Sequence, residues 1–431
     1  MNLTENISEV VQLSKSKIAK DSAIVLTGNI LGAGLGFIAT ILIVRTLGPA
    51  QFGLFSVALA VMGIATQFSD FGIGTGLVRF ASLYLRQDKL KADLMFKVSL
   101  KLKLIISVLV FLIGFFASES LAVHVFRKPE LIFPLKLAFI GALGASLVAY
   151  ISATLQARQS FKKFALFNLV NPVGKFALIG LLFLTYKLNL FSALTTVIIL
   201  PFIAFLIGSL IIPRDFLRAK GDEKEAFHNL FHFSKWILVS TLCVIIFTRL
   251  DVLMLGYFKV MEEAGYYSAG YNLGFGFSIL LGSFITVLLP EFSKLTEKQQ
   301  IIKYIKKTLK ITSHIAIIFL PILFLAKPLI LVIYGTSYLN SAIIFQILFL
   351  RFLLVLVFNP TTLVIYSINK PQIGAYGNLL QLIFNVTGNY LVIPVYGAFG
   401  AAMVTLITDV VGTCFILYLL YIYFKNQRVL T

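Results

Sequence analysis

Charged residues inside long apolar segments are the side chains of this sequence best placed to do chemistry. Seven of them lie within such segments or at an inner end: Asp70, Arg79, Lys175, Arg249, Asp251, Arg351 and Asp409. A Lys or Arg at the centre of a bilayer costs at least about 2.5–3.5 kcal/mol when it faces lipid, so such residues usually face a partner or a cavity. These seven residues are therefore the first candidates for a functional site.

The deep cations outnumber the deep carboxylates. Lys175 stands about 16 Å by helical rise from either end of the apolar segment 164–186, which is too far for its side chain to reach an interface. Arg249 and Asp251 are two residues apart and cannot pair on their own helix. Two interpretations stay open. The charges form interhelical ion pairs that hold the bundle together, for instance Lys175 with Asp409, or they line a cationic cavity for an anionic headgroup.

Polar stripes accompany these charges. Asn168, Asn171 and Lys175 follow one another at spacings of three and four, which places them on one helical face. A second segment carries an equivalent stripe: Asn378, Gln381, Asn385 and Asn389. Each half of the chain is thus predicted to present one polar face at matching depth. Asp70 and Arg79 lie nearer the cytoplasmic end of their apolar segment. This position favours a role for the two residues in gating transport or in setting the topology of the chain.

The elements that position these residues are transmembrane helices. The first apolar segment, 22–44, spans about 35 Å as a helix without a charge and exceeds the roughly 30 Å hydrocarbon core of a bilayer. Membrane segments of this length in which apolar and polar residues do not alternate are helices rather than strands of a β-barrel. The sequence predicts an all-α integral membrane protein with twelve spans: 22–44, 52–77, 98–118, 132–156, 164–186, 190–212, 233–257, 264–289, 309–332, 339–367, 372–394 and 397–424.

The distribution of basic residues predicts the orientation in the membrane. The chain is 59% hydrophobic with a net charge of +19, and leaves no stretch for a sizeable water-soluble domain. Of its 37 Lys and Arg residues, twenty-six fall at one side of the predicted spans, Lys103 among them, and seven at the other. The positive-inside rule then places both termini in the cytoplasm and explains the basic loops without nucleic acid. Residues 1–21 are polar and predict no cleavable signal peptide.

A short internal repeat divides the chain. A shift of 212 residues lays AGYYS at 264–268 on FGLFS at 52–56, each at the start of the second helix of a half. We therefore predict two six-helix parallel repeats with a central cavity near the midplane. The predicted parts are a cytoplasmic segment 1–21, a first half 22–212, a cytoplasmic linker 213–232, a second half 233–424 and a cytoplasmic tail 425–431.

Motifs for nucleotide or metal chemistry are weak. Gly174-Lys175 lacks the flanking residues of a phosphate-binding loop, so ATP hydrolysis by that route is excluded. His228 and His232 stand four apart, as metal ligands on one helix can. Without a further ligand nearby, we interpret them as part of an interfacial amphipathic helix in the linker. Cys243 and Cys414 fall inside predicted helices and imply no disulfide.

Three runs of sequence carry a family resemblance: KDS at 20–22 leading to GN at 28–29, RTLGPAQFGLFS at 45–56, and DFGIG at 70–74. With its length, helix count and repeat, the chain resembles the polysaccharide transporter (Wzx-like flippase) family of the multidrug/oligosaccharidyl-lipid/polysaccharide exporter superfamily. The resemblance implies a V-shaped bundle that flips polyprenyl-diphosphate-linked oligosaccharide, the repeat unit of a surface polysaccharide, across the cytoplasmic membrane. It implies a cationic cavity for the diphosphate, which Lys175, Arg249 and Arg351 can supply.

Two alternatives remain beside this flippase. The first is an integral-membrane glycosyltransferase or polysaccharide polymerase using the same lipid carrier, although the first outer turn, 45–51, has no acidic residue. The second is an ion-coupled multidrug or lipid II exporter. It is disfavoured because the first helix lacks the arginines of lipid II flippases and the aspartate that some multidrug extruders use.

The sequence thus predicts a transporter rather than an enzyme, with two groups of site residues. The expected substrate-binding residues are Lys175, Arg249, Arg351, Asn168, Asn378 and Asn385, and the expected residues for ion coupling or gating are Asp70, Arg79, Asp251 and Asp409. We expect no cofactor or metal, and coupling to a H⁺ or Na⁺ gradient stays open. The expected partners are the lipid-linked oligosaccharide, membrane lipids and other polysaccharide assembly proteins, but no nucleic acid.

Overall fold

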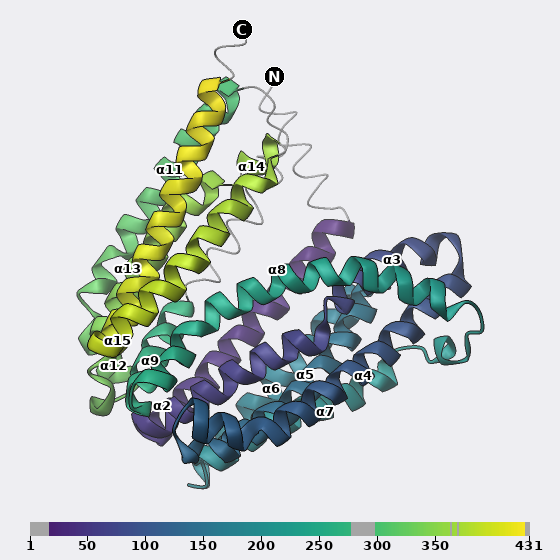
Figure 1. Cartoon of the computed structure of the whole chain (residues 1–431), viewed down its shortest axis with the longest axis horizontal. Helices are drawn as coiled ribbons and strands as arrows, with labels where there is room; N and C mark the ends of the chain where they lie inside the picture. The colour runs from purple at the N-terminus through teal and green to yellow at the C-terminus, as the bar shows by residue number, and fades with distance from the viewer. Residues whose placement is uncertain (1–16, 277–297, 363, 369, 427–431) are drawn as a thin grey trace. The chain divides into compact units, whose positions relative to one another are not determined.

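The computed structural model describes residues 17–276, 298–362, 364–368 and 370–426 (Figure 1). All regular secondary structure in these ranges is helical. The helices fall into two compact units. Unit 1 comprises Met1–Thr46 and Ala58–Ile246, and unit 2 comprises Leu47–Val57 and Phe247–Thr431.

Unit 1 is built from long helices that agree with the predicted spans. Segments 98–118 and 132–156 each fall within one helix, and 164–186 and 190–212 each match one helix that ends two residues and one residue earlier. Helices α4, α5 and α7 pack side by side, and α3 lies on α4 and α5. The elements of this unit are α2 (Lys17–Asp70) apart from Leu47–Val57, α3 (Ile73–Gln87), α4 (Lys89–Ser120), η1 (Leu121–Val125), η2 (Pro129–Leu131), α5 (Ile132–Ala157), α6 (Phe161–Leu184), α7 (Leu190–Ile211), η3 (Asp215–Arg218) and the first part of α8 (Glu223–Phe258).

The predicted span 52–77 is wrong as a single helix. Helix α2 ends at Asp70, and the next two residues, Phe71 and Gly72, have φ values of 50° and 73°. This left-handed region is costly for residues with a side chain and easy for glycine, so the DFG sequence breaks the helix and α3 restarts at Ile73. The break sets the direction of the charged residues that follow it.

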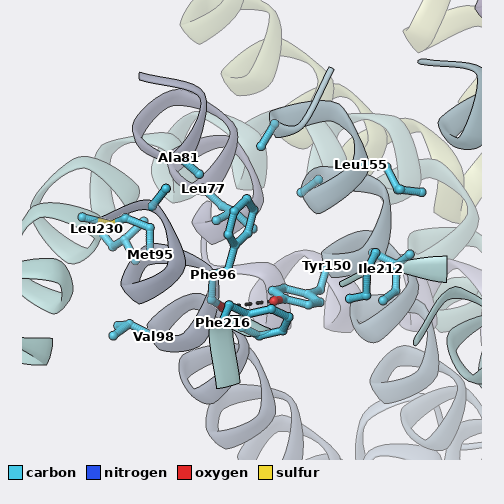
Figure 2. Packing of buried hydrophobic residues seen from close by; sticks show 14 of the residues in the cluster. Leu77, Ala81, Met95, Phe96, Val98, Tyr150, Leu155, Ile212, Phe216 and Leu230 are labelled. Atoms are coloured by element: carbon cyan, nitrogen blue, oxygen red, sulfur yellow. Dashed lines mark hydrogen bonds between the residues drawn. The ribbon is translucent and has the colours of Figure 1, made fainter. Parts of the chain in front are cut away.

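The core of unit 1 includes residues from the predicted linker. Figure 2 shows Phe96, Tyr150 and Phe216 packed together, with the Tyr150 hydroxyl donating to the Phe96 carbonyl oxygen at 3.0 Å. Phe216 and Leu230 lie in the segment 213–232 and are buried in this cluster. The segment between the predicted halves is therefore packed against unit 1. The predicted domain boundaries themselves remain a prediction.

Unit 2 contains the remaining helices, of which α11, α13 and α15 pack together and α9 lies against α13 and α15. The predicted span 309–332 is bent by 67° at residues 324–325, between the helical stretches 299–323 and 326–333. Just before the bend, α11 gives way to the short helix η4, which contains Pro321. The elements are the end of α8, α9 (Met261–Phe275), α11 (Lys298–Phe319), η4 (Leu320–Leu323), α12 (Ala326–Ile333), η5 (Thr336–Tyr338), α13 (Ser341–Thr362), α14 (Val364–Ser367) and α15 (Pro371–Asn426).

Apolar helices of membrane-spanning length dominate the structure. Seven in the described ranges are long and apolar enough to cross a bilayer, or eight when the bent pair around Pro321 counts as one span. Two of these, 23–87 and 372–425, contain 65 and 54 residues, each more than twice the roughly 20 residues that one crossing needs. Each contains a non-helical glycine, Gly48 or Gly397. The protein is thus an all-helical membrane protein, and the count of twelve spans remains a prediction.

Candidate functional site

A buried carboxylate with neutral partners is the most developed polar site in unit 2. Asp251 of α8 is 5% exposed. Its Oδ1 accepts from the side-chain amides of Asn389 at 2.6 Å and Asn385 at 3.4 Å, both on α15. Its Oδ2 accepts from the Thr405 hydroxyl at 2.8 Å and from the Tyr267 hydroxyl of α9. Three helices therefore converge on one carboxylate, and we call these five residues the Asp251 cluster.

The Asp251 cluster has the chemistry of a site for a proton or a small cation. A buried charge needs compensation, and here the four donors, from Asn389, Asn385, Thr405 and Tyr267, are all neutral. Within the described residues, Asn389 Oδ1 is buried without a hydrogen-bond partner, so an acceptor oxygen beside the carboxylate is left over. Carboxylate, amide and hydroxyl oxygens are the ligands that hard cations prefer. A cation at this place would satisfy the charge and the leftover oxygen together.

The second polar site in unit 2 is an ion pair. Arg351 of α13 donates from Nε to Asp409 Oδ2 of α15 at 2.6 Å. The two residues line a cavity of about 230 Å³ whose other walls include Leu354, Phe358 and Leu417. Asp409 therefore pairs with Arg351, because α13 and α15 pack side by side. The pairing of Asp409 with Lys175, which lies in unit 1, remains a prediction. Asp409, one of the expected residues for ion coupling or gating, is thus one partner of an ion pair.

Unit 1 holds a carboxylate of a different kind, which is partly buried. Asp70 Oδ1 lies 2.5 Å from the ammonium of Lys103 on α4. The Lys103 side chain is fully buried and also donates to the Ser146 carbonyl oxygen at 3.0 Å. Lys103 was counted among the basic residues of the inner side, and that side remains a prediction. The position of Lys103 within the predicted span 98–118 was the signal that it lies inside the bundle.

The other predicted residues of unit 1 have separate neighbours. Lys175 donates to the Thr40 hydroxyl of α2 at 3.1 Å, and Asn168 accepts from Ser152 of α5 at 2.8 Å. Arg79 of α3 stacks on Phe233 of α8. The shared face of Asn168 and Lys175 on α6 therefore contacts two different helices.

Two predicted residues of unit 2, Arg249 and Asn378, differ from the members of both polar sites. Arg249 has a buried Nε without a hydrogen-bond partner among the described residues, and Asn378 is exposed. The structure thus joins Asp251 with Asn385 and Arg351 with Asp409. That Lys175, Arg249 and Arg351 line one cavity remains a prediction.

Sequence reasoning missed three members of these sites. Tyr267 and Thr405 carry no charge, and Lys103 was counted only among the basic residues of the inner side. Asn389 appeared in the polar stripe but not among the site residues. The described residues contain no group of three His, Cys, Asp or Glu side chains that could hold a metal ion.

Comparison with known proteins decides the family. Residues 18–296 match the family described as "Polysaccharide biosynthesis protein". The chain belongs to this family. It is 24% identical to the "Probable low-salt glycan biosynthesis flippase Agl15" of Haloferax volcanii, over 92% of this chain and 82% of that protein. It is 24% identical to the "Lipopolysaccharide biosynthesis protein WzxC" of Escherichia coli, over 92% of this chain and 78% of that protein.

A solved structure shares the fold. The structure described as "Lipid II flippase MurJ, inward closed conformation" matches with a TM-score of 0.74 at 15% identity, over 92% of this chain and 87% of that chain. The family resemblance carried by the runs at 20–29, 45–56 and 70–74 is thus confirmed. The chain therefore shares its all-helical fold with this structure.

Proposed function

We propose that this protein is a flippase that moves polyprenyl-diphosphate-linked oligosaccharide, the repeat unit of a surface polysaccharide, across the cytoplasmic membrane by alternating access. The observation that carries the proposal is family membership over most of an all-helical membrane chain, with flippases and polysaccharide proteins among its relatives. A transporter, rather than an enzyme, also fits a chain without a sizeable water-soluble domain.

The proposal includes twelve spans in two parallel repeats with both termini in the cytoplasm. A reciprocal glycine contact supports the repeat. A Cβ on Gly53 would collide with the Met261 carbonyl, and a Cβ on Gly265 would collide with the Pro49 carbonyl. Gly53 and Gly265, like Pro49 and Met261, are related by the same shift of 212 residues. Two equivalent helix starts therefore cross at equivalent glycines, which let their backbones approach closely.

The proposed substrate contacts are the deep cations and their polar neighbours: Lys175, Arg249, Arg351, Asn168, Asn378 and Asn385. A diphosphate offers acceptors for a planar guanidinium, whose charge-assisted hydrogen bonds are strong when water is excluded. Arg351 uses Nε for Asp409, and we assign its terminal nitrogens to phosphate. The cavity beside this ion pair is mostly apolar, which suits a lipid-linked group.

The proposal assigns coupling to the Asp251 cluster. A H⁺ or Na⁺ bound there would neutralise the buried carboxylate, and its release would leave a charge held only by neutral donors. The ion-bound and ion-free forms of the cluster would therefore differ in charge. An ion gradient can drive alternating access only if the ion binds the two conformations of the protein with different affinity. The sequence lacks a phosphate-binding loop, so we expect no cofactor and no nucleotide.

The test is a flipping assay with the full-length protein in sealed proteoliposomes that contain a polyprenyl-diphosphate oligosaccharide. Flipping should proceed without nucleotide, and the glycolipid should keep its mass. Arg351→Ala, Arg249→Ala and Lys175→Ala should each reduce flipping at unchanged insertion, with partial recovery in Arg351→Lys. Matched controls are Lys306→Ala and Lys310→Ala on α11, near its predicted cytoplasmic end.

Normal flipping in all three alanine variants would show that these charges are structural. A change in glycolipid mass would favour the glycosyltransferase or polymerase alternative. Reporter fusions after Arg218 and Arg428 check the orientation, because a reporter active only outside the cytoplasm should be silent at both positions.

A further inference from the structure

A cationic pocket in unit 1 is not used by the proposed transport site. It has a volume of about 360 Å³ and is lined by six residues of α3 and α8: Arg79, Phe80, His228, Asn229, His232 and Phe233. No acidic side chain is among them. The pocket therefore combines one permanent cation, two imidazoles and an amide.

Two glycines bring the walls of the pocket together. A Cβ on Gly72 would lie 2.7 Å from the Ser234 carbonyl oxygen, and one on Gly76 would lie 3.1 Å from the Ser234 hydroxyl. Larger residues at these positions would push α8 away from α3. The glycines of the DFGIGTG run thus place the start of α8 against the face of α3 that carries Arg79.

Aromatic rings hold the guanidinium in the pocket. The Arg79 Cζ lies 4.6 Å from the centroid of the Phe233 ring and 5.6 Å from that of the Phe80 ring. The two rings meet edge to face at 5.7 Å. Stacking covers the face of a guanidinium and leaves the N–H groups at its edge for hydrogen bonds. Arg79 is therefore pre-oriented for an anion with several acceptor oxygens.

The two histidines complete the anion-binding wall. His228 and His232 lie one turn apart on α8, with ring centroids 6.1 Å apart and an interplanar angle of 22°. Imidazole N–H groups and the Asn229 amide are hydrogen-bond donors. A guanidinium with several additional N–H donors is a typical arrangement for a phosphate group.

The surroundings of the pocket indicate that its ligand belongs to the membrane. Arg79 is eight residues, or about 12 Å, from the end of α3 at Gln87. The positive-inside bias places this end at the cytoplasmic surface, so Arg79 falls near headgroup depth. On α8, Phe227 and Phe231 are 43% and 45% exposed, stack on each other, and form an apolar flank. An exposed aromatic flank beside a cationic pocket suits a phosphate carried by an apolar chain.

We propose that this pocket binds the phosphate group of an anionic lipid at the cytoplasmic surface of the membrane. The shared chemistry is a lipid phosphate, whose source is a membrane phospholipid or a polyprenyl diphosphate. The proposal does not rest on the flippase function, because it concerns a pocket in unit 1 whose lining includes none of the proposed substrate contacts.

Lipid retention by the purified full-length protein tests the proposal. Native mass spectrometry from detergent containing phosphatidylglycerol, phosphatidylcholine or undecaprenyl diphosphate gives the bound lipid. Arg79→Gln should lower retention of the anionic lipid about tenfold, the effect of losing one charge-assisted interaction. The matched control is Arg86→Gln, a cation on the same helix that does not line the pocket and should retain the wild-type level.

Three further arms make the outcome decisive. His232→Gln should weaken retention less than Arg79→Gln, and it serves as the test variant if Arg79→Gln does not fold by gel filtration. Displacement of phosphatidylglycerol by undecaprenyl diphosphate would identify the diphosphate as the source, and failure to displace would identify the phospholipid. Equal retention of phosphatidylcholine, or wild-type retention in both variants, overturns the proposal. So does stabilisation by Zn²⁺ that His228→Gln abolishes and Arg79→Gln leaves intact, which would show a metal site.

Discussion

Two carboxylates, a partly buried one in unit 1 and a buried one in unit 2, are stabilised in opposite ways. Asp70 in unit 1 faces the ammonium of Lys103, a fixed cation supplied by the protein itself. Asp251 in unit 2 faces two amides and two hydroxyls, all neutral. An opposite charge stabilises a buried carboxylate permanently, whereas neutral donors compensate it only in part.

The difference separates a structural charge from an exchangeable one. The partner of Asp70 cannot leave, so a cation from solution gains little by binding there. The hydrogen bonds of Asp251 come from neutral groups, and Asn389 Oδ1 beside it has no partner among the described residues. We therefore expect unit 1 to depend on its carboxylate for stability and unit 2 to depend on its carboxylate for ion response. The predictions below test this contrast.

The largest effect on stability is expected from Lys103→Met. The variant leaves the partly buried Asp70 beside a neutral side chain, and losing one partner of a fully buried ion pair costs about 3–5 kcal/mol, which is the upper limit here. Thermal unfolding of the purified protein, followed by the loss of monodisperse protein on gel filtration, should shift markedly to lower temperature. The double variant Asp70→Asn with Lys103→Met removes both charges and should recover most of the loss. No recovery would mean that Lys103 acts through packing alone.

Asp251→Asn is expected to change function more than stability. The substitution keeps the shape of the side chain and most of its hydrogen-bonding capacity while removing the charge, so unfolding should shift little. Flipping should lose its stimulation by a Na⁺ or H⁺ gradient, by about 5- to 150-fold for a typical coupling free energy. Asp70→Asn is the matched control and should keep the stimulation in whatever protein folds. Unchanged gradient dependence in Asp251→Asn would remove the distinction between the two carboxylates.

Removal of one neutral donor should give an intermediate effect. Thr405→Val deletes the hydroxyl that donates to Asp251 Oδ2 and should cost about 1–3 kcal/mol, the range for an unsatisfied buried group. It should also raise the ion concentration needed for half-maximal stimulation of flipping. Thr387→Val on the same helix is the control, because its exposed hydroxyl donates only to backbone carbonyls within α15. Equal effects of the two changes would indicate a general response of α15.

The sequence predicted the helices and the charged residues better than the partners of those residues. Segment length and hydropathy are local properties, and 132–156 and 190–212 agree with α5 and α7 within a residue at each end. Which residues meet depends on how each helix is rotated and how deeply it packs. A run of apolar residues does not reveal that Thr405 or Tyr267 points at Asp251, because both residue types are common in apolar helices.

Breaks in the helices were the second limit. The DFG run at 70–72 was quoted for its family resemblance, yet its left-handed backbone and the close approach of Ser234 to Gly72 became visible only in three dimensions. The environment of the charged residue Lys103 was likewise not visible in the sequence. Counting basic residues by side gives the orientation, since the excess is large, but a count does not distinguish a solvated lysine from one that is fully buried.

A third carboxylate, Glu223 at the start of α8, provides the exposed counterpart and the smallest expected effect. Its two oxygens contact Lys97 at 2.9 Å and Lys101 at 2.6 Å, and its side chain is 37% exposed. Hydrogen bonds from Lys101 and Lys97 hold the pKa of the Glu223 carboxyl below its usual range. The stabilisation is therefore fully present above the ordinary glutamate pKa of about 4.3 and is lost as the pH falls through the lowered value.

Thermal unfolding of Glu223→Gln should differ slightly from the wild type at pH 7, much less than for Lys103→Met, and the difference should shrink in 1 M salt and below about pH 4. Exposed ion pairs are screened by water, so the shift in unfolding temperature of Glu223→Gln should be small. A shift as large as that of Lys103→Met would show that burial does not determine how much each of the three carboxylates contributes to stability.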